Sequence, residues 1–341
     1  MMLMLSACAA CSTESWDEWD DGENSYNNST TTSDDDNKPT KTTGDDVASG
    51  SSTAGDVTKF TVELNKSAIS ETLKVDTGDD DYIENSSFAK TITITFSKTG
   101  SATVSGDDAG IVAINGNDVV ATNTTETVIK YVLTGETTDG FFKLYSSKKQ
   151  AIVLNGVSIT NPDGAAINNQ SKKRTFIVLN DGTKNYLTDG TKYSDATDSE
   201  DMKACFFREG QLIFSGSGYL EVDANCKAGI RSDDYVRTMP NTNIYVDASS
   251  GNGIRGNDAV IVTGGVINVN ITGTADKGIS TDGEVRIDGG RTTILTSGGY
   301  EYDSDDKDYS ACSGIKADSI IHINGGELNI KSTGTGGQGL N

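Results

Sequence analysis

Gly229-Ile230-Arg231-Ser232-Asp233-Asp234 opens a line of sequence that recurs along the C-terminal half of this chain. The same line returns as Gly253-Ile254-Arg255-Gly256-Asn257-Asp258, Gly278-Ile279-Ser280-Thr281-Asp282-Gly283 and Gly314-Ile315-Lys316-Ala317-Asp318-Ser319, and it opens once more at Gly339-Leu340-Asn341. The starting glycines lie 24, 25, 36 and 25 residues apart. Earlier starts align at Ala204, Ala166, Gly140 and Gly110. A base period of about 25 residues with occasional longer lines is typical of a solenoid.

Each line also carries a second glycine register, which helps to identify the type of solenoid. It reads Thr263-Gly264-Gly265, Asp288-Gly289-Gly290 and Asn324-Gly325-Gly326. Between the glycines run three short segments of alternating apolar and polar residues, the pattern of half-buried strands. The sequence therefore predicts an all-β fold, a right-handed single-stranded parallel β-helix with about 25 residues per coil. A propeller needs longer blades, of roughly 40 residues or more.

The strand after each starting glycine predicts which side chains fill the core. Side chains alternate along a strand, so one set points inward and stacks between coils. That inward ladder is expected to contain Cys205, Ile230, Ile254, Ile279 and Ile315. Cys205, Cys226 and Cys312 are the three cysteines of the repeat region. An odd number with this spacing fits neither a disulfide framework nor a zinc motif. We expect buried thiols.

The residues that point outward from the same strand suggest a binding surface. Arg231, Arg255 and Lys316 share one outer stripe, where they could pair with the carboxylates of an acidic polysaccharide. Beside the stripe runs an acidic column formed by Asp233, Asn257, Asp282 and Asp318, with Asp234 and Asp258 next to it.

Carboxylates stacked about 4.8 Å apart repel one another, so this column needs a compensating interaction. A calcium ion could supply it, because Ca²⁺ binds six to eight oxygen ligands. The neighbouring cations, or turn N–H groups capped by the acids, could supply it equally well. Both alternatives remain open at this stage.

Two lines are longer than the rest, and their extra residues fall at equivalent positions. One insert spans about 190–203 and contains Tyr193, and the other spans 298–309 and contains Tyr300 and Tyr302. Insertions on one side of a repeat array often form its binding face. The tyrosines could stack on sugar rings, whereas the alternative is a pair of solvated acidic loops.

Charge divides the chain into two parts. The 341 residues include 50 acidic and 28 basic side chains, for a net charge of −22. Residues 1–56 hold twelve acids and two bases, which account for −10 of that charge. This composition argues against nucleic acid as a partner. We expect residues 12–56 to be a disordered acidic linker and residues 57–341 to be the β-helix of a monomeric protein.

The first residues resemble a bacterial lipoprotein processing site. Leu5-Ser6-Ala7-Cys8 fits a lipobox in which Cys8 is lipidated, and residues 1–11 are then a signal remnant whose true start lies upstream. Cys11 is an alternative acceptor, and a chance cysteine is the other interpretation. Acids soon after Cys8 resemble the export signal of Bacteroidetes-type surface lipoproteins. The expected location is the bacterial outer membrane, facing outward through the lipid anchor.

From about Thr91 to its end the chain resembles bacterial carbohydrate-binding domain-containing proteins whose β-helix is similar to polysaccharide lyases. The resemblance lies in Leu154–Asn161, Asp163–Ile167, Leu179–Thr183, Leu187–Gly190 and the Gly-Ile-Arg/Lys lines. It implies a calcium-binding β-helix that binds cellulose or acidic plant polysaccharide, without established lyase activity. The chain departs from the family pattern at Ala204–Phe207 and ends within a repeat, so C-terminal coils are expected to be missing.

Three functions follow as hypotheses. The first is non-catalytic, calcium-assisted binding of polysaccharide at the cell surface. The second is a calcium-dependent polysaccharide lyase, in which a lysine or arginine near the acidic column, such as Lys277, removes a proton next to a uronate carboxylate. The third is a surface adhesin or structural protein.

Overall fold

The described part of the computed structural model comprises residues 61–194, 200–304 and 307–341. Cys8, Cys11 and the acidic linker lie outside these residues. Val62–Asn341 forms one compact unit. The regular structure of its described residues is β-sheet apart from one 3-10 turn, η1 (Ile83–Asn85). Among the same residues no helix has the length and apolar character to cross a membrane.

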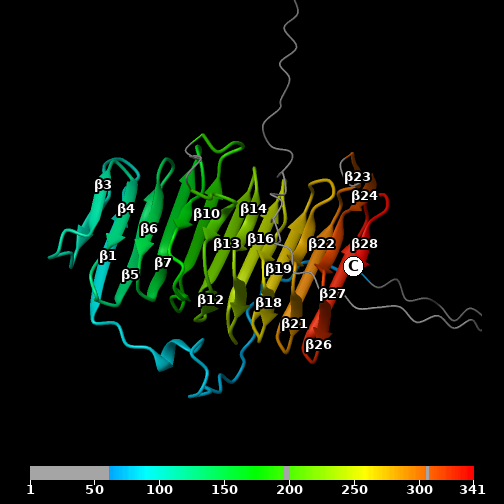
Figure 1. Cartoon of the computed structure of the whole chain (residues 1–341), viewed down its shortest axis with the longest axis horizontal. Helices are drawn as coiled ribbons and strands as arrows, with labels where there is room; N and C mark the ends of the chain where they lie inside the picture. The colour runs from blue at the N-terminus through cyan, green and yellow to red at the C-terminus, as the bar shows by residue number, and fades with distance from the viewer. Residues whose placement is uncertain (1–60, 195–199, 305–306) are drawn as a thin grey trace, which may run out of the picture. The chain divides into compact units, whose positions relative to one another are not determined.

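From β8 onward the chain passes repeatedly through three columns of parallel strands, named here faces 1, 2 and 3 (Figure 1). Face 3 is formed by β8 (Ile167–Asn169), β11 (Ala204–Arg208), β14 (Ala228–Ser232), β17 (Ile254–Gly256), β20 (Lys277–Thr281), β25 (Ser313–Ala317) and β28 (Gln338–Leu340). Face 1 is formed by β9 (Thr175–Leu179), β12 (Leu212–Ser215), β15 (Tyr235–Thr238), β18 (Ala259–Val262), β21 (Glu284–Ile287) and β26 (Ile320–Ile323). Face 2 is formed by β10 (Lys184–Asp189), β13 (Tyr219–Ala224), β16 (Asn243–Ala248), β19 (Val266–Ile271), β22 (Arg291–Thr296) and β27 (Glu327–Ser332). The predicted all-β solenoid of parallel strands is confirmed.

The first turns are less regular than the later coils. They contain β1 (Lys90–Phe96), β2 (Thr103–Ser105), β3 (Val112–Asn115), β4 (Asp118–Asn123), β5 (Ile129–Thr137), β6 (Phe141–Ser146) and β7 (Gln150–Asn161). β1 pairs with β2, and β3 with β4, in antiparallel fashion. The repeat start aligned at Gly110 is therefore wrong, because the strand after it belongs to a hairpin. β7 pairs with both β9 and β10 and so joins faces 1 and 2.

The inward ladder has the predicted register over four coils. Ile230 pairs with Ile254, Ile254 with Ile279 and Ile279 with Ile315, and all four side chains are buried. The next member is Phe206, not Cys205. A slip of one residue moves a side chain to the opposite side of a strand, yet Cys205 is still fully buried, as are Cys226 and Cys312, and all three are free thiols.

The starting glycine of each line is required by space. A Cβ on Gly253 would lie 2.4 Å from Val269 Cγ1 and 2.6 Å from the carbonyl oxygen of Gly278 in the next coil. Gly229, Gly278 and Gly314 meet the same kind of obstruction. In the second register a conformational reason is added to the spatial one, because Gly265, Gly290 and Gly326 have φ values of 93°, 72° and 80° as well as close neighbours.

Residues 62–89, named here the N-terminal strap, do not form a coil although the sequence assigns them to the solenoid. Asn65 exchanges two backbone–amide hydrogen bonds with Asn268 of β19. Glu71 accepts hydrogen bonds from the backbone N–H groups of Asn241 and Gly265. Farther along the strap, Asp81 receives hydrogen bonds from arginines of β15 and the loop before β9. The strap thus crosses several coils on the outer surface before the chain enters β1.

Candidate functional site

The predicted basic stripe is in register on face 3. Arg231 pairs with Arg255, Arg255 with Ser280 and Ser280 with Lys316. The exposure of these side chains differs from coil to coil. Arg231 is only 8% exposed and the Arg255 side chain 13%, whereas the Lys316 side chain is 41% exposed.

The acidic column is also in register, at the corner that follows face 3. Each backbone N–H there donates to a carbonyl oxygen of the preceding coil, as Asn257 does to Ser232 and Asp282 to Asn257. Asp233 and Asp318 continue the column in the same way.

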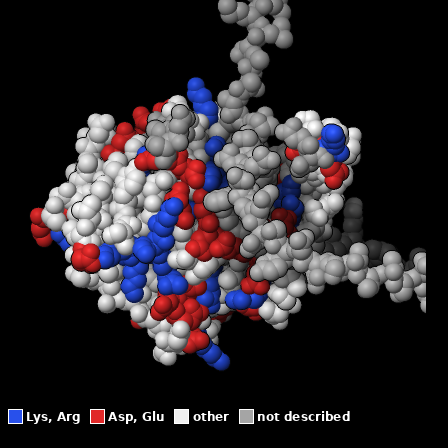
Figure 2. Space-filling model, in the orientation of Figure 1, with Lys and Arg blue, Asp and Glu red and all other residues white. Residues whose placement is uncertain are grey.

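The stripe and the column neutralise one another. Arg255 Nη2 lies 2.8 Å from both carboxylate oxygens of Asp282, and Lys316 Nζ lies 3.1 Å from Asp318. Arg231 Nε lies 3.5 Å from Asp233. On the face shown in Figure 2, basic and acidic side chains likewise lie interleaved. Neighbouring cations therefore supply the compensation that stacked carboxylates need.

The two acids beside the column have different surroundings. Asp234 accepts hydrogen bonds from Gln211 and from the N–H of Tyr235. Burial, together with the nearby charge of Asp258, raises the pKa of Asp234 despite these bonds. Asp258 is exposed, with its backbone N–H bonded to the carbonyl oxygen of Asp234.

One acidic group has the composition of a calcium site. Carboxylate oxygens of Asp201, Glu209 and Asp233 lie within 4.8 Å of one another. Lys203 Nζ lies 2.7 Å from Asp201 and 3.1 Å from Asp233, so one cation already bridges two of them. Burial and the other two carboxylates raise the pKa of Glu209.

This donor set fits Ca²⁺, which prefers carboxylate oxygens. Asp233 Oδ1 is buried without a hydrogen-bond partner, although Arg231 Nε lies 3.5 Å from it. Of the predicted metal ligands only Asp233 belongs to this group. Glu209 was missed because the repeat alignment is one residue out of register at Ala204. In the structure Arg208 pairs with Ser232, so Glu209 holds the repeat position of Asp233 in the preceding coil. Asp201 comes from the first insert, which no repeat position relates to Asp233.

Both inserts emerge at the same corner, as predicted, because one follows β10 and the other β22 of face 2. Their tyrosines differ. The Tyr193 hydroxyl donates to Asp189 Oδ2 at 2.6 Å, and Lys227 lies over its ring at 5.7 Å. Tyr193 is therefore half-buried and tied to face 2 rather than displayed to a sugar.

The second insert is a hairpin of β23 (Tyr300–Asp303) and β24 (Asp308–Ala311). Tyr300, Tyr302 and Tyr309 are 48%, 51% and 61% exposed. The Tyr309 ring lies 5.2 Å from that of Tyr300 and 5.0 Å from that of Tyr302, between ring centroids. These three rings are named here the tyrosine cluster. Tyr309 ends the same predicted insert but was not among the named sugar-stacking residues. The hairpin pairing of Tyr302 with Tyr309 brings it next to the others.

Lys277, on β20, differs from the other cations in its contacts. Its Nζ donates to Ser310 Oγ at 2.8 Å and to the carbonyl oxygen of Ala275. Burial, followed by the nearby charge of Lys316, lowers the pKa of Lys277. A lysine with a lowered pKa is more readily deprotonated and can act as a base.

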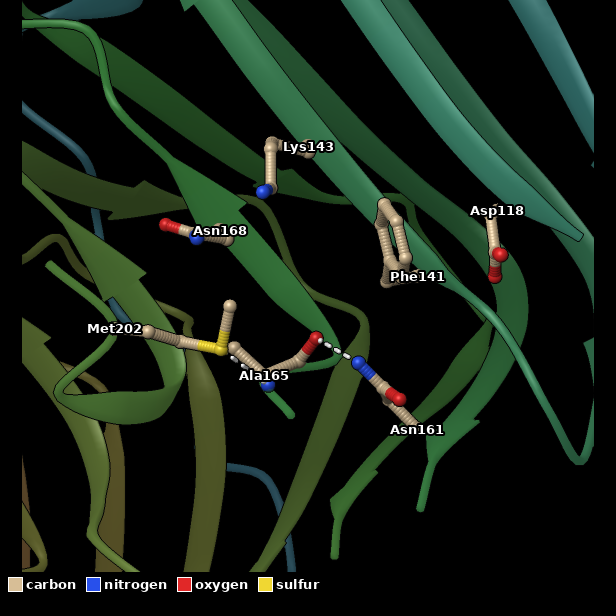
Figure 3. A pocket seen from close by; sticks show the side chains of 7 residues that line it. All are labelled: Asp118, Phe141, Lys143, Asn161, Ala165, Asn168 and Met202. Carbon is tan, nitrogen blue, oxygen red and sulfur yellow. Dashed lines mark hydrogen bonds between the residues drawn. The ribbon is translucent and has the colours of Figure 1, made fainter. Parts of the chain in front are cut away.

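A pocket opens on the outer side of the first coils (Figure 3). Its walls include Phe141 and Lys143 of β6, Asp118 of β4, Asn168 of β8 and Met202. The sequence misses this pocket because the repeat alignment places Phe141, rather than Phe142, in the inward ladder. In the structure Phe142 pairs with Ile167 and is buried, so Phe141 faces outward.

Comparison with known proteins places these features in context. A family model described as carbohydrate-binding domain-containing protein matches residues 115–275 and 268–339, more than half of the chain. A carbohydrate-binding domain-containing protein of Acetivibrio thermocellus is 33% identical over 145 residues, which are 40% of this chain and 50% of that protein. This chain thus spans about half the length of that relative. A polysaccharide lyase-like protein from C. thermocellum, solved as a gadolinium derivative, has a similar structure, with a TM-score of 0.53 and 25% identity. That match covers 74% of this chain and 97% of the solved chain.

Proposed function

Because this chain belongs to the family of carbohydrate-binding domain-containing proteins, we propose that it binds polysaccharide without cleaving it. The glycans in question are cellulose-like or acidic, pectin-like chains. The binding surface is the tyrosine cluster on the β23–β24 hairpin. The proposal follows from membership of this family. The family model confirms the resemblance that the sequence predicts.

The exposure of the tyrosine cluster carries the proposal. Exposed aromatic rings are costly to hydrate, whereas the apolar face of a sugar ring can cover them while its hydroxyl groups stay in water. Among the described large apolar residues, Tyr309 is the most exposed, at 61%. The contacts between the three rings restrict their rotation, so little conformational entropy is lost when a glycan docks.

We extend the proposal to calcium at Asp201, Glu209 and Asp233. The Lys203 ammonium would leave the site, and the ion would bind these carboxylates and tie the end of the first insert to face 3. Calcium at this position assists binding by fixing a corner of the solenoid. Asp282 and Asp318 keep their pairing with Arg255 and Lys316.

The finer description of fold and location belongs to the same proposal. We propose a right-handed, single-stranded winding of about 25 residues per coil, supported by partner offsets of 24 and 25 residues along the Ile230–Ile254–Ile279 ladder. The protein would act as a monomer at the outer surface of a bacterial outer membrane, held by a lipid on Cys8 and the acidic linker 12–56.

Retention on polysaccharide tests the proposal. Wild-type protein is run in native gels with embedded soluble glucan or polygalacturonate, and is mixed with insoluble cellulose. Each of Tyr302→Ala and Tyr309→Ala is expected to weaken binding, by up to roughly 10-fold for an aromatic contact of about 0.5–1.5 kcal/mol. Tyr186→Ala is the matched control, because Tyr186 is 39% exposed but lies on face 2.

The results distinguish a site on the hairpin from a site on face 2 and from no binding at all. Loss of retention in the hairpin variants alone supports the proposal. Loss in Tyr186→Ala alone would move the site to face 2. Absence of retention on every polysaccharide would reject polysaccharide binding.

Lys277 favours a second candidate, a polysaccharide lyase. Its lowered pKa and its position near Arg255 and Lys316 are the features that an elimination base next to a bound uronate requires. Steady formation of unsaturated products from polygalacturonate, lost in Lys277→Met, would establish this activity. Lys307→Met is the control, because Lys307 is an exposed lysine of the neighbouring hairpin turn.

A further inference from the structure

The pocket on the outer side of β4, β6 and β8 has features of a built binding site that are separate from the tyrosine cluster. Its volume is about 280 Å³, close to the lower end of ligand pockets, which span about 300–1,000 Å³. Such a volume suits one sugar residue and not a longer segment of chain.

The wall of the cavity contains a buried amide. Asn168 is 1% exposed, and its Oδ1 accepts a hydrogen bond from Gln170 Nε2 at 2.6 Å. Its Nδ2 has no hydrogen-bond partner in the described structure. A buried N–H group without a partner is destabilising, so the site is complementary to a ligand oxygen that can accept this bond.

Two apolar surfaces flank the donor. The ring of Phe141 forms one wall and the side chain of Met202 another, as Figure 3 shows. Met202 is held in place because its Sδ accepts a hydrogen bond from the backbone N–H of Ala165 at 3.3 Å. An aromatic wall beside a polar donor matches the two kinds of surface that a pyranose ring presents.

The charges around the pocket select against an acidic sugar. Lys143 Nζ lies 2.9 Å from Glu200 Oε2, and Glu200 also accepts a hydrogen bond from the Tyr145 hydroxyl. Although burial opposes it, these two hydrogen bonds hold the pKa of Glu200 below its usual value, so this carboxylate is ionised. Together with Asp118, the described residues at the pocket carry two carboxylates against one ammonium, and a uronate would add a third negative charge.

We propose that this pocket is a subsite for one residue of a neutral polysaccharide. The apolar face of the sugar packs on Phe141, and one of its hydroxyl oxygens accepts a hydrogen bond from Asn168 Nδ2. The inference rests on the proposed polysaccharide-binding function and adds a second contact point with a preference for neutral sugars.

Calorimetric titration with short oligosaccharides tests the subsite separately from the tyrosine cluster. The probes are cellotriose, xylotriose and mannotriose as neutral chains and trigalacturonate as the acidic one. Wild-type protein is expected to bind at least one neutral trisaccharide at least 10-fold more tightly than trigalacturonate. Phe141→Ala should weaken that binding 10-fold or more, whereas Phe141→Tyr should retain it. Asn168→Asp keeps the acceptor for Gln170 but replaces the free donor, so it should also weaken binding.

Melting curves of each variant show whether the fold is intact. Equal effects of Phe141→Ala and Tyr302→Ala on trisaccharide binding, or tighter binding of trigalacturonate, would overturn the subsite. Retention on polysaccharide with no trisaccharide binding would overturn the subsite and leave the proposed function standing. If neither oligosaccharides nor polysaccharides bind, both proposals are wrong.

Discussion

Arg255 Nη2 lies 2.8 Å from both carboxylate oxygens of Asp282, a residue of the next coil. The two side chains come from the stripe and the column that the sequence marks as separate binding elements. Their contact joins consecutive coils at the corner of face 3. The structure thus gives these residues a role in holding the coils together.

Arg255→Ala is expected to destabilise the fold by about 0.5–1.5 kcal/mol, because it removes a charge-assisted pair in which Asp282 is still half exposed. Urea unfolding midpoints measure this loss. Arg255→Lys keeps the charge but loses the contact to both oxygens, so it should fall between the wild type and Arg255→Ala. Retention on a neutral glucan should not change. Lost glucan retention with an unchanged unfolding midpoint would return the basic stripe to the binding surface.

Gly253→Ala is expected to destabilise the solenoid by about 1–3 kcal/mol, the usual cost of overpacking a filled space. The added methyl group would meet Val269 and the carbonyl oxygen of Gly278. Gly339→Ala is the matched control, because Gly339 holds the same repeat position with no atom within 4 Å of the added group. Thermal melting compares the two variants. Similar melting temperatures for both would show that the repeat does not depend on this close approach.

Asp189 makes the stability of the fold depend on pH. Burial raises its pKa from 3.8 to about 6, although Tyr193 and Asn225 donate hydrogen bonds to it. The native state therefore binds a proton more tightly than the unfolded chain, and the stability from this group is complete below about pH 4 and lost as pH rises to about 6.

Asp189→Asn should flatten that part of the stability profile, as measured by urea unfolding at half-unit steps from pH 4 to 7. Asp276, whose pKa burial also raises to about 6, leaves a residual slope. The quantity to compare is the difference between the two profiles. A constant difference over the whole range would mean that Asp189 titrates normally in the native state.

Millimolar calcium is expected to raise the melting temperature of the wild type, since an ion that binds only the folded state stabilises it. For a domain of this size each kcal/mol corresponds to roughly 2–4 °C. Asp233→Asn should remove most of the gain, because it weakens one of three carboxylate ligands. Asp318→Asn serves as the control in the same acidic column. An equal gain in both variants would place the ion elsewhere.

The sequence predicts the later coils well because each requirement there is local. A glycine is needed where coils touch, and an isoleucine follows it inward, so the pattern repeats at Ile230, Ile254 and Ile279. The predicted register is wrong by one residue at Ala204 and at Gly140, because no glycine–isoleucine pair marks it there. In the structure Phe206 and Phe142 take the inward positions.

The candidate site is harder to predict, because its contacts join residues far apart in the chain. Lys143 meets Glu200, 57 residues away, and Asn65 meets Asn268, 203 residues away. Repeat alignment relates equivalent positions in neighbouring coils and gives no information about such contacts. It finds columns of like residues, and it leaves open whether a column faces solvent or pairs with its neighbour.

The N-terminal strap determines how mechanical load enters the solenoid. A pull on residue 61 reaches Asn65 and Glu71 first, and both are bonded to coils in the later half of the unit, at Asn268 and Gly265. The force therefore acts first on the coil that contains β19, and β1 is not pulled away from its neighbours. Several hydrogen bonds along the strap bear this force together. Single-molecule stretching between residues 61 and 341 would record release of the strap as a discrete early extension, before any coil unravels.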